Sequence, residues 1–215
     1  MLPAIYLGWD LNLEFLNGWW ESINPTKAEF QLETGIYHHS LTALKPSLLS
    51  ATEGELELKR NLISLNTTSA VLLMNIARAV LIVSVLWFLP KPFKAANIRL
   101  SELRGIAYIL LLVPLIFPHQ PKYAFAFIIP SVFYLGFFIS KLRLSKRLPQ
   151  FKLLQALVIT SFVVMVFSSD LFLGKELGRI AQHFKLLTWG SLLLIPALLI
   201  AAPKKLDGFR TQDVE

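Results

Sequence analysis

The sequence places two histidines next to a hydroxyl side chain in the triplet His38-His39-Ser40. Imidazole and hydroxyl groups serve as metal ligands, general bases and nucleophiles. Adjacent side chains point in different directions on a regular backbone, so the two histidines do not predict a bidentate metal site. No carboxylate lies at a spacing that completes a triad, and the chain contains no cysteine. The triplet therefore predicts neither a metal centre nor a triad, and the catalytic residues stay unassigned.

A polar turn, Pro118-His119-Gln120-Pro121-Lys122, follows an apolar run over 105–117. A helix of that length is about 20 Å long, about 10 Å less than a hydrocarbon core. If the helix starts near Gly105 at the cytoplasmic surface, the turn lies below the outer surface, where it must line a cavity. If the helix starts near Leu100, the turn lies at the level of the lipid headgroups. The sequence leaves both alternatives open.

Three basic residues, Lys175, Arg179 and His183, follow at i, i+4 and i+8, which places them on one face of a helix. Such a stripe suits a lipid phosphate. A solvated helix face is the alternative. Asp170 precedes the stripe and is open to three interpretations: a helix cap, a binding residue or no special role.

Arg78 is the one charged residue in the apolar run over 70–89. A charge at the centre of a bilayer costs at least about 2.5 kcal/mol, so we expect Arg78 to face protein or a cavity. Asn75 falls on roughly the same helical stripe, which predicts an inward polar face. Asn75 and Arg78 are therefore candidate intramembrane polar residues, in either a structural hydrogen-bonded cluster or a functional site.

Membrane helices must position these side chains. Of the 215 residues, 54% are hydrophobic and only 16% are charged, whereas an average soluble domain is about a quarter charged. The apolar runs after residue 67 do not alternate polar with apolar residues as barrel strands do. We predict an all-α polytopic membrane protein with an extracytoplasmic segment over 1–67, a transmembrane region over 68–203 and a tail over 204–215. The five predicted spans are 70–89, 105–117, 123–140, 153–169 and 186–202.

The charges predict the orientation of these spans. Four basic residues and one acid lie between the first two spans, and five basic residues without an acid occupy 141–152. The segment 1–67 carries eight acids against four bases. By the positive-inside rule, the N-terminal segment lies outside and the C-terminus in the cytoplasm, in the plasma (inner) membrane. The net charge of +7 is thus an orientation signal, and we expect membrane lipids rather than nucleic acid as partners.

Two amphipathic stretches occupy the N-terminal segment. Trp9, Leu13, Leu16 and Trp20 recur at helical spacing, with Pro25 beyond them. A second, leucine-rich stretch covers 41–49. We expect both to lie as interfacial helices on the outer leaflet. Because 67 residues without a signal peptide precede the first span, we also expect this chain to be the C-terminal part of a longer protein.

The order of motifs resembles glycosyltransferase family 87, a group of GT-C membrane enzymes. The likeness covers roughly 10–200. It rests on a tryptophan-bearing element (Leu16-Asn17-Gly18-Trp19-Trp20), a short polar element (Tyr37-His38-His39-Ser40-Leu41) and a span that ends in Pro114-Leu115-Ile116-Phe117-Pro118-His119. The sequence departs from the family pattern by having His for Asn-Gln in the polar element and Phe117 for the usual Trp.

The resemblance implies transfer of a mannose-like hexose from a polyprenyl-phosphate sugar to a lipid or glycan acceptor on the outer face. It implies no cofactor, and it places the catalytic carboxylate in a first outer loop that this chain lacks. The implied substrate contacts are His39, Ser40, His119, Gln120 and Lys122. From topology and chemistry, Lys175 and Arg179 are added as phosphate ligands. A non-catalytic membrane scaffold and a transporter fragment are the alternatives.

Overall fold

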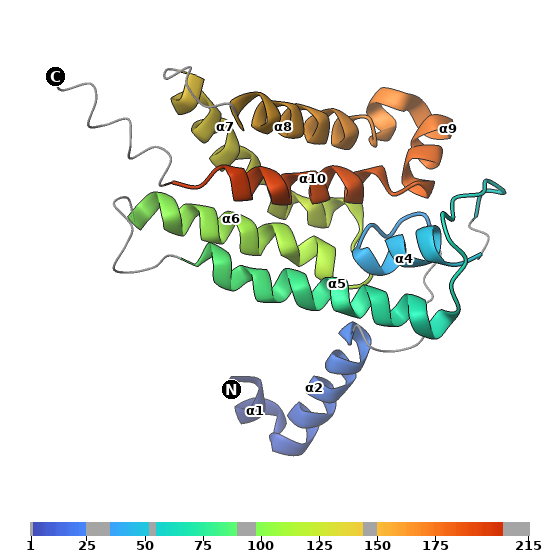
Figure 1. Cartoon of the computed structure of the whole chain (residues 1–215). Coiled ribbons are helices and arrows are strands. Elements are labelled where there is room, and N and C mark those ends of the chain that lie inside the picture. Colours follow the sequence, from blue (N-terminus) through green and yellow to red (C-terminus); the bar gives the residue numbers. More distant parts are fainter. Residues whose placement is uncertain (1, 25–34, 52–54, 90–97, 144–149, 204–215) are drawn as a thin grey trace.

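The computed structural model describes residues 2–24, 35–51, 55–89, 98–143 and 150–203 (Figure 1). Its described part is all-α, with nine α-helices and one 3₁₀ helix. The predicted tail over 204–215 and most of the two basic loops lie outside the described residues. In chain order the helices are α1 (Leu2–Leu7), α2 (Trp9–Ile23), α4 (Leu41–Leu49), α5 (Thr67–Phe88), α6 (Ile98–Ile116), η1 (Lys122–Ile128), α7 (Ile129–Arg143), α8 (Gln150–Val166), α9 (Asp170–His183) and α10 (Leu186–Ile200).

Each of the five predicted spans contains a helix, but not every helix is long and apolar enough to cross a membrane. Two candidate spans are long and apolar enough by themselves: Thr67–Phe88, and Lys122–Leu142, which joins η1 to α7. A third exists if α8 and α9 together form one bent span. The apolar helix α10 has only 15 residues. The structure therefore has two to three candidate membrane spans by length and composition.

Helix α6 is longer than the predicted span. It begins at Ile98 and ends at Ile116, so its 19 residues measure about 28 Å along the helix axis. The shortfall inferred from the run over 105–117 therefore does not arise. The early start is possible because Arg104 is accommodated within the fold: its Nε donates to the Leu198 carbonyl at 2.9 Å, and its guanidinium lies 4.6 Å from the centre of the Phe88 ring.

The chain turns sharply between α8 and α9, whose axes are bent by 81°. Helix α9 starts at Asp170 and is itself interrupted at Gly174, which has a positive φ of 72°. Glycine adopts this left-handed conformation without a steric penalty. Asp170 begins a new helix over 170–183, which contains the helical stretch expected over 175–183 and extends it toward the N-terminus.

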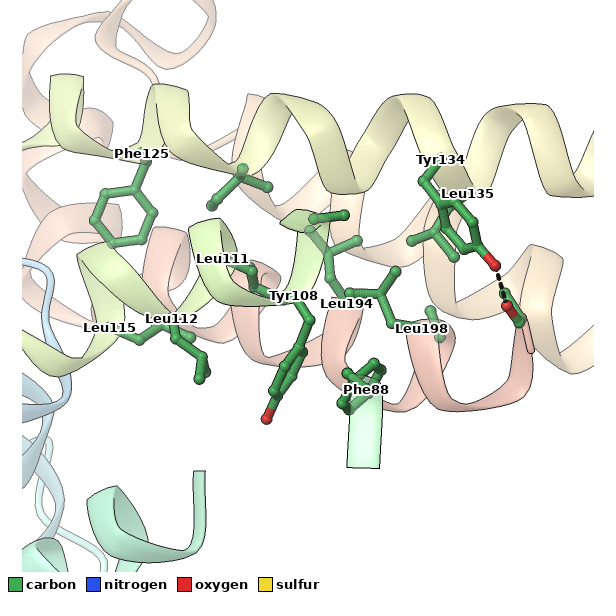
Figure 2. Close-up of a cluster of buried hydrophobic side chains, with 14 of the residues drawn as sticks. Phe88, Tyr108, Leu111, Leu112, Leu115, Phe125, Tyr134, Leu135, Leu194 and Leu198 are labelled. Atoms are coloured by element: carbon green, nitrogen blue, oxygen red, sulfur yellow. Dashed lines mark hydrogen bonds between the residues drawn. The ribbon is translucent and has the colours of Figure 1, made fainter. Parts of the chain in front are cut away.

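The core lies where α6, α7 and α10 meet (Figure 2). Tyr108 of α6 stacks on Phe88 of α5 with ring centres 3.8 Å apart. The Tyr134 hydroxyl donates to the Ala201 carbonyl, so α7 is tied to the end of α10. Burial of these aliphatic and aromatic side chains holds the bundle together. The fully buried members include Leu111, Leu115, Leu135, Leu194 and Leu198.

Helices α8 and α10 approach each other closely at Gly190. A β-carbon at this position would lie 2.5 Å from Met165 Cγ and 3.1 Å from the Ser161 carbonyl oxygen. The Ser161 hydroxyl donates to the Gly190 carbonyl at 2.6 Å. Small residues at helix contacts allow such close packing in membranes. The contact between α8 and α10 brings the start of α10 toward the loops that carry the polar motifs.

The two predicted interfacial helices have different surroundings. Helix α2 is exposed along its length, including the rings of Trp9, Trp19 and Trp20. The interfacial prediction for 41–49 is wrong: every residue from Leu41 to Ser47 is buried, and α4 packs against α5 and α6. An interfacial helix needs a polar stripe that faces solvent. Helix α4 has none, since Thr42 and Lys45 are themselves buried in the protein.

Candidate functional site

Two of the motifs singled out in the sequence lie side by side. The backbone N–H of His39 donates to the carbonyl of Gln120 at 2.9 Å, and the rings of His38 and His119 meet edge to face with centres 5.0 Å apart. The turn reaches this position through His119, whose φ of 53° is left-handed. Histidine is among the non-glycine residues enriched in that region.

Lys185 fixes the segment before His39. Its side chain is completely buried, and its Nζ donates to the carbonyls of Gly35 at 2.6 Å and His38 at 2.7 Å. Lys185 is also left-handed, with φ of 56°, at the N-cap of α10. Thr188, within the first turn of α10, donates to the His39 carbonyl. The start of α10 thus holds the backbone on both sides of the His38–His39 peptide.

The His39 imidazole is buried and electrically neutral. It is 1% exposed and packs edge to face on Phe125. Burial, and then the nearby charges of Lys185, Lys122 and His38, lower the pKa of His39 to about 3. Neither ring nitrogen has a hydrogen-bond partner among the described residues. Both nitrogens are therefore available to a ligand or to water.

Two further buried groups near the start of α4 lack partners. The Ser40 hydroxyl is at the N-cap position of α4 but does not cap it, and it makes no hydrogen bond to a described residue. The Lys45 ammonium is 3% exposed and equally without a described partner. Burial and the charge of Arg78 lower the pKa of Lys45. Segment 39–45 thus presents an imidazole, a hydroxyl and an amine that the described fold leaves unsatisfied.

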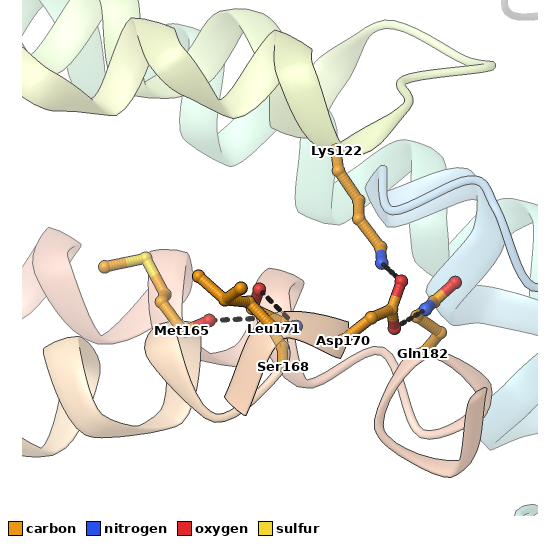
Figure 3. A network of polar contacts seen from close by, with 7 residues as sticks. Lys122, Met165, Ser168, Asp170, Leu171 and Gln182 are labelled. Atoms are coloured by element: carbon orange, nitrogen blue, oxygen red, sulfur yellow. Dashed lines mark hydrogen bonds and ion pairs between the residues drawn. The ribbon is translucent and has the colours of Figure 1, made fainter. Parts of the chain in front are cut away.

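Lys122 connects the polar turn to α9 (Figure 3). Its Nζ lies 2.9 Å from Asp170 Oδ2, and the Gln182 side-chain amide donates to Asp170 Oδ1 at 2.8 Å. The side chains of Lys122 and Asp170 are 38% and 49% exposed, so this pair lies at the edge of the site and open to solvent. Asp170 is not the N-cap of α9, which is Ser169; it bonds Lys122 and Gln182 beside the polar turn, a contact that none of the three interpretations named.

Arg78 and Asn75 do not share an environment. Arg78 is buried, and its guanidinium donates to the hydroxyl of Thr42 on α4. Asn75 is exposed on the same helix. Of the two candidates, only Arg78 therefore faces the protein interior, as was inferred for both. Arg78 ties α5 to the helix that follows the His39-Ser40 motif.

The predicted phosphate ligands of α9 lie apart from the histidines. Lys175 and Arg179 are exposed, and neither has a hydrogen bond or ion pair to another described residue. His183, the third member of the stripe, is buried and faces the Leu58 carbonyl at 2.9 Å from Nε2. Because His183 is buried while Lys175 and Arg179 are exposed, the three basic residues do not form one exposed stripe.

Five of the seven predicted substrate contacts, His39, Ser40, His119, Gln120 and Lys122, come together in the structure. Sequence reasoning missed Lys185, Thr188 and Gln182. The position of Lys185 in the sequence could have indicated its role. A lysine directly before an apolar run either flanks a span at the membrane surface or is buried and holds another segment. The described residues contain no group of three or more side chains able to hold a metal ion.

The arrangement brings together a neutral imidazole, a hydroxyl and an amine that lack described partners, with the ion pair of Lys122 and Asp170 at its rim. Comparison of the chain with protein-family models, curated proteins and solved structures finds no match. The function must therefore be argued from the residues themselves.

Proposed function

We propose that this chain is part of an integral membrane hexosyltransferase that takes a mannose-like sugar from a polyprenyl-phosphate donor and transfers it to a lipid or glycan acceptor outside the membrane. The observation that carries the proposal is the contact of His39 with Gln120. It joins the two motifs on which the family resemblance depends, although they are far apart in the sequence.

The unsatisfied buried groups support a ligand at this position. A buried polar group without a partner costs about 1–3 kcal/mol, and such groups in native proteins call for an explanation. The ring nitrogens of His39 and the Ser40 hydroxyl can each accept or donate a hydrogen bond. Sugar hydroxyls supply both functions, so a glycosyl group would satisfy these atoms.

The cationic groups support a phosphate. Direct displacement at the anomeric carbon transfers the acceptor proton to a carboxylate, forms the new glycosidic bond and releases polyprenyl phosphate. Negative charge grows on the leaving phosphate, and nearby cationic or hydrogen-bonding groups stabilise it. Lys122 at the rim and His119 in the turn are our candidates for this role. The base stays unassigned, because Asp10 and Glu14 are exposed on α2 and have no described contact with the cluster.

The proposal includes a topology. Five spans cross the plasma (inner) membrane, the segment 1–67 and the turn at His119 lie outside, and the C-terminus lies in the cytoplasm. The two basic loops support this orientation. Because Lys122 and the His38–His119 pair lie together, this topology places the whole cluster at the outer face, where lipid-linked sugars and their acceptors are accessible.

The test is transfer of label. Full-length protein in proteoliposomes is incubated with radiolabelled polyprenyl-phosphate mannose and a lipid extract, and the acceptor fraction is counted. We expect label in the acceptor fraction above that of empty liposomes. Absence of transfer with mannose, glucose and galactose donors, in protein that retains its fold, would remove the enzymatic proposal and favour a scaffold.

A further inference from the structure

A groove of about 690 Å³ runs between η1–α7 and α8. Its walls carry no polar side chain: they consist of aliphatic and aromatic residues such as Phe125, Val132 and Phe162, together with Gly136. Phe133, in its wall, is 75% exposed. Lys122–Leu142 is one of the candidate membrane spans, so the groove opens sideways at the depth of the hydrocarbon core.

The two ends of the groove differ in charge. Toward one end, Phe125 follows Lys122, whose ammonium is neutralised by Asp170. At the other end, the exposed Lys141 places its Nζ 5.6 Å from the centre of the Phe137 ring, which lines the groove. Lys141 forms no ion pair with a described acid. The Lys141 end is therefore the one that offers an uncompensated positive charge.

We propose that this groove is a phospholipid site: it holds one acyl chain of an anionic phospholipid of the surrounding bilayer, with the lipid phosphate on the ammonium of Lys141. The site is separate from the proposed transferase centre. It shares the η1–α7 element with that centre but uses the opposite end of the element and a different kind of ligand.

The size of the groove favours an acyl chain. If each methylene occupies about 30 Å³, as a water molecule does in the liquid, the groove holds on the order of 20 carbon atoms. That is the length of one acyl chain and is too short for a long polyprenyl chain. Seven residues of η1 and α7 contribute to the wall, so the chain would lie along the axis of this span, as the acyl chains of the bilayer do.

Charge decides the headgroup. Lys122 already has an ion-pair partner in Asp170, whereas Lys141 has none among the described acids, so Lys141 attracts the phosphate of a bilayer lipid more strongly. A basic residue near a membrane surface contributes about 1 kcal/mol toward binding of anionic lipid. We therefore expect an anionic phospholipid to bind about fivefold more tightly than a zwitterionic one of the same chain length.

Gly136 provides a direct test of the groove. A β-carbon added there meets nothing within 4 Å, so the side chain of Gly136→Leu has room to start into the groove. The full chain is purified in mild detergent, exchanged into mixtures of phosphatidylglycerol and phosphatidylcholine, and examined by native mass spectrometry. We expect one retained phosphatidylglycerol per chain in the unmodified protein and a several-fold loss in Gly136→Leu at an unchanged melting temperature.

Two charge variants complete the experiment. Lys141→Gln should remove the roughly fivefold preference for phosphatidylglycerol, while Lys59→Gln, at an exposed lysine outside the groove, should keep it. Equal retention of the two phospholipids by the unmodified protein would overturn the proposal, as would full retention by Gly136→Leu. Displacement of phosphatidylglycerol by equimolar polyprenyl phosphate would also overturn it. None of these readings depends on sugar transfer.

Discussion

The carboxylate of Asp170, the first residue of α9, lies directly against the backbone of Gly178, which follows the interruption at Gly174. A β-carbon at Gly178 would stand 2.1 Å from Asp170 Oδ1 and 3.1 Å from its Cα. Asp170 can therefore bond both Lys122 and Gln182 only because residue 178 has no side chain. The polar network at the rim of the site therefore depends on the absence of a side chain at Gly178.

Gly178→Ala should consequently disconnect this network. The methyl group displaces the carboxylate, so the bonds from Lys122 and Gln182 are lost together. A half-exposed ion pair contributes about 0–1 kcal/mol and a hydrogen bond about 0.5–1.5 kcal/mol, so we expect about 1–2 kcal/mol of destabilisation, measured by denaturation in detergent. The matched control is Gly136→Ala, where nothing obstructs the methyl group and a helix gains about 0.5–1 kcal/mol. Equal effects of the two substitutions would contradict the close contact.

Stability should decrease in mild acid because of His39. The unfolded chain protonates this imidazole near its ordinary pKa of 6.5, whereas burial lowers the pKa in the folded protein to about 3. The unfolded state therefore binds more protons between these values. The contribution is complete above pH 6.5 and is lost as the pH falls toward 3, at up to about 1.4 kcal/mol per pH unit.

The measurement is thermal melting in detergent between pH 7.5 and 4.5, with His39→Gln as the comparison. Glutamine retains a polar side chain but does not titrate in this range. We expect the melting temperature of the variant to fall less steeply with decreasing pH than that of the unmodified protein. Parallel curves would show that His39 titrates normally and is not buried as described.

Transfer activity should depend on Lys122 and His119. Loss of a group that stabilises charge in the transition state lowers kcat by about a hundredfold or more, and we expect this of Lys122→Ala and His119→Ala. His119→Asn separates the ring from the backbone, since asparagine also tolerates the left-handed conformation that His119 adopts. Lys59→Ala, at an exposed lysine with no predicted role in the site, is the charge control. Unchanged rates in both alanine variants would exclude these two residues from the site.

The proposed orientation can be tested on a chain without background reactivity, because the sequence contains no cysteine. Single cysteines are introduced at Tyr37 and Lys152, both of which are exposed. A membrane-impermeant maleimide should label Tyr37→Cys in intact cells and Lys152→Cys only after permeabilisation. Labelling of both from the same side would refute the proposed topology.

Hydrophobic runs in the sequence located the bundle, but not the details of its helices. An apolar run marks residues that avoid water, so it indicates the centre of α5 or α10 well. It cannot show where a helix that continues into charged residues begins. Helix α6 extends back to Ile98 because Arg104 finds a backbone carbonyl and an aromatic ring in distant parts of the chain. Only the tertiary structure provides these partners.

The same limitation applies to the site. Spacing and residue type identified His39, Ser40 and the turn at His119 as polar elements flanking the spans. The contact of His39 with Gln120 depends on two left-handed residues, His119 and Lys185, the second of which also holds the His38 carbonyl. Neither residue has a local sequence signature. Helix α4 was misplaced for a related reason: a surface helix and a helix whose polar residues are buried have similar patterns over nine positions.

The anchoring of the site by Lys185 also imposes an order on its formation. The carbonyls that Lys185 holds belong to residues 147 to 150 positions earlier in the chain, and such distant contacts form late. During synthesis, the His39 segment therefore cannot adopt its final position until the later helices have been made. The contacts around this segment form only when α10 has been synthesised and packed. A protease that acts on incompletely folded protein would encounter an incomplete site until α10 is in place.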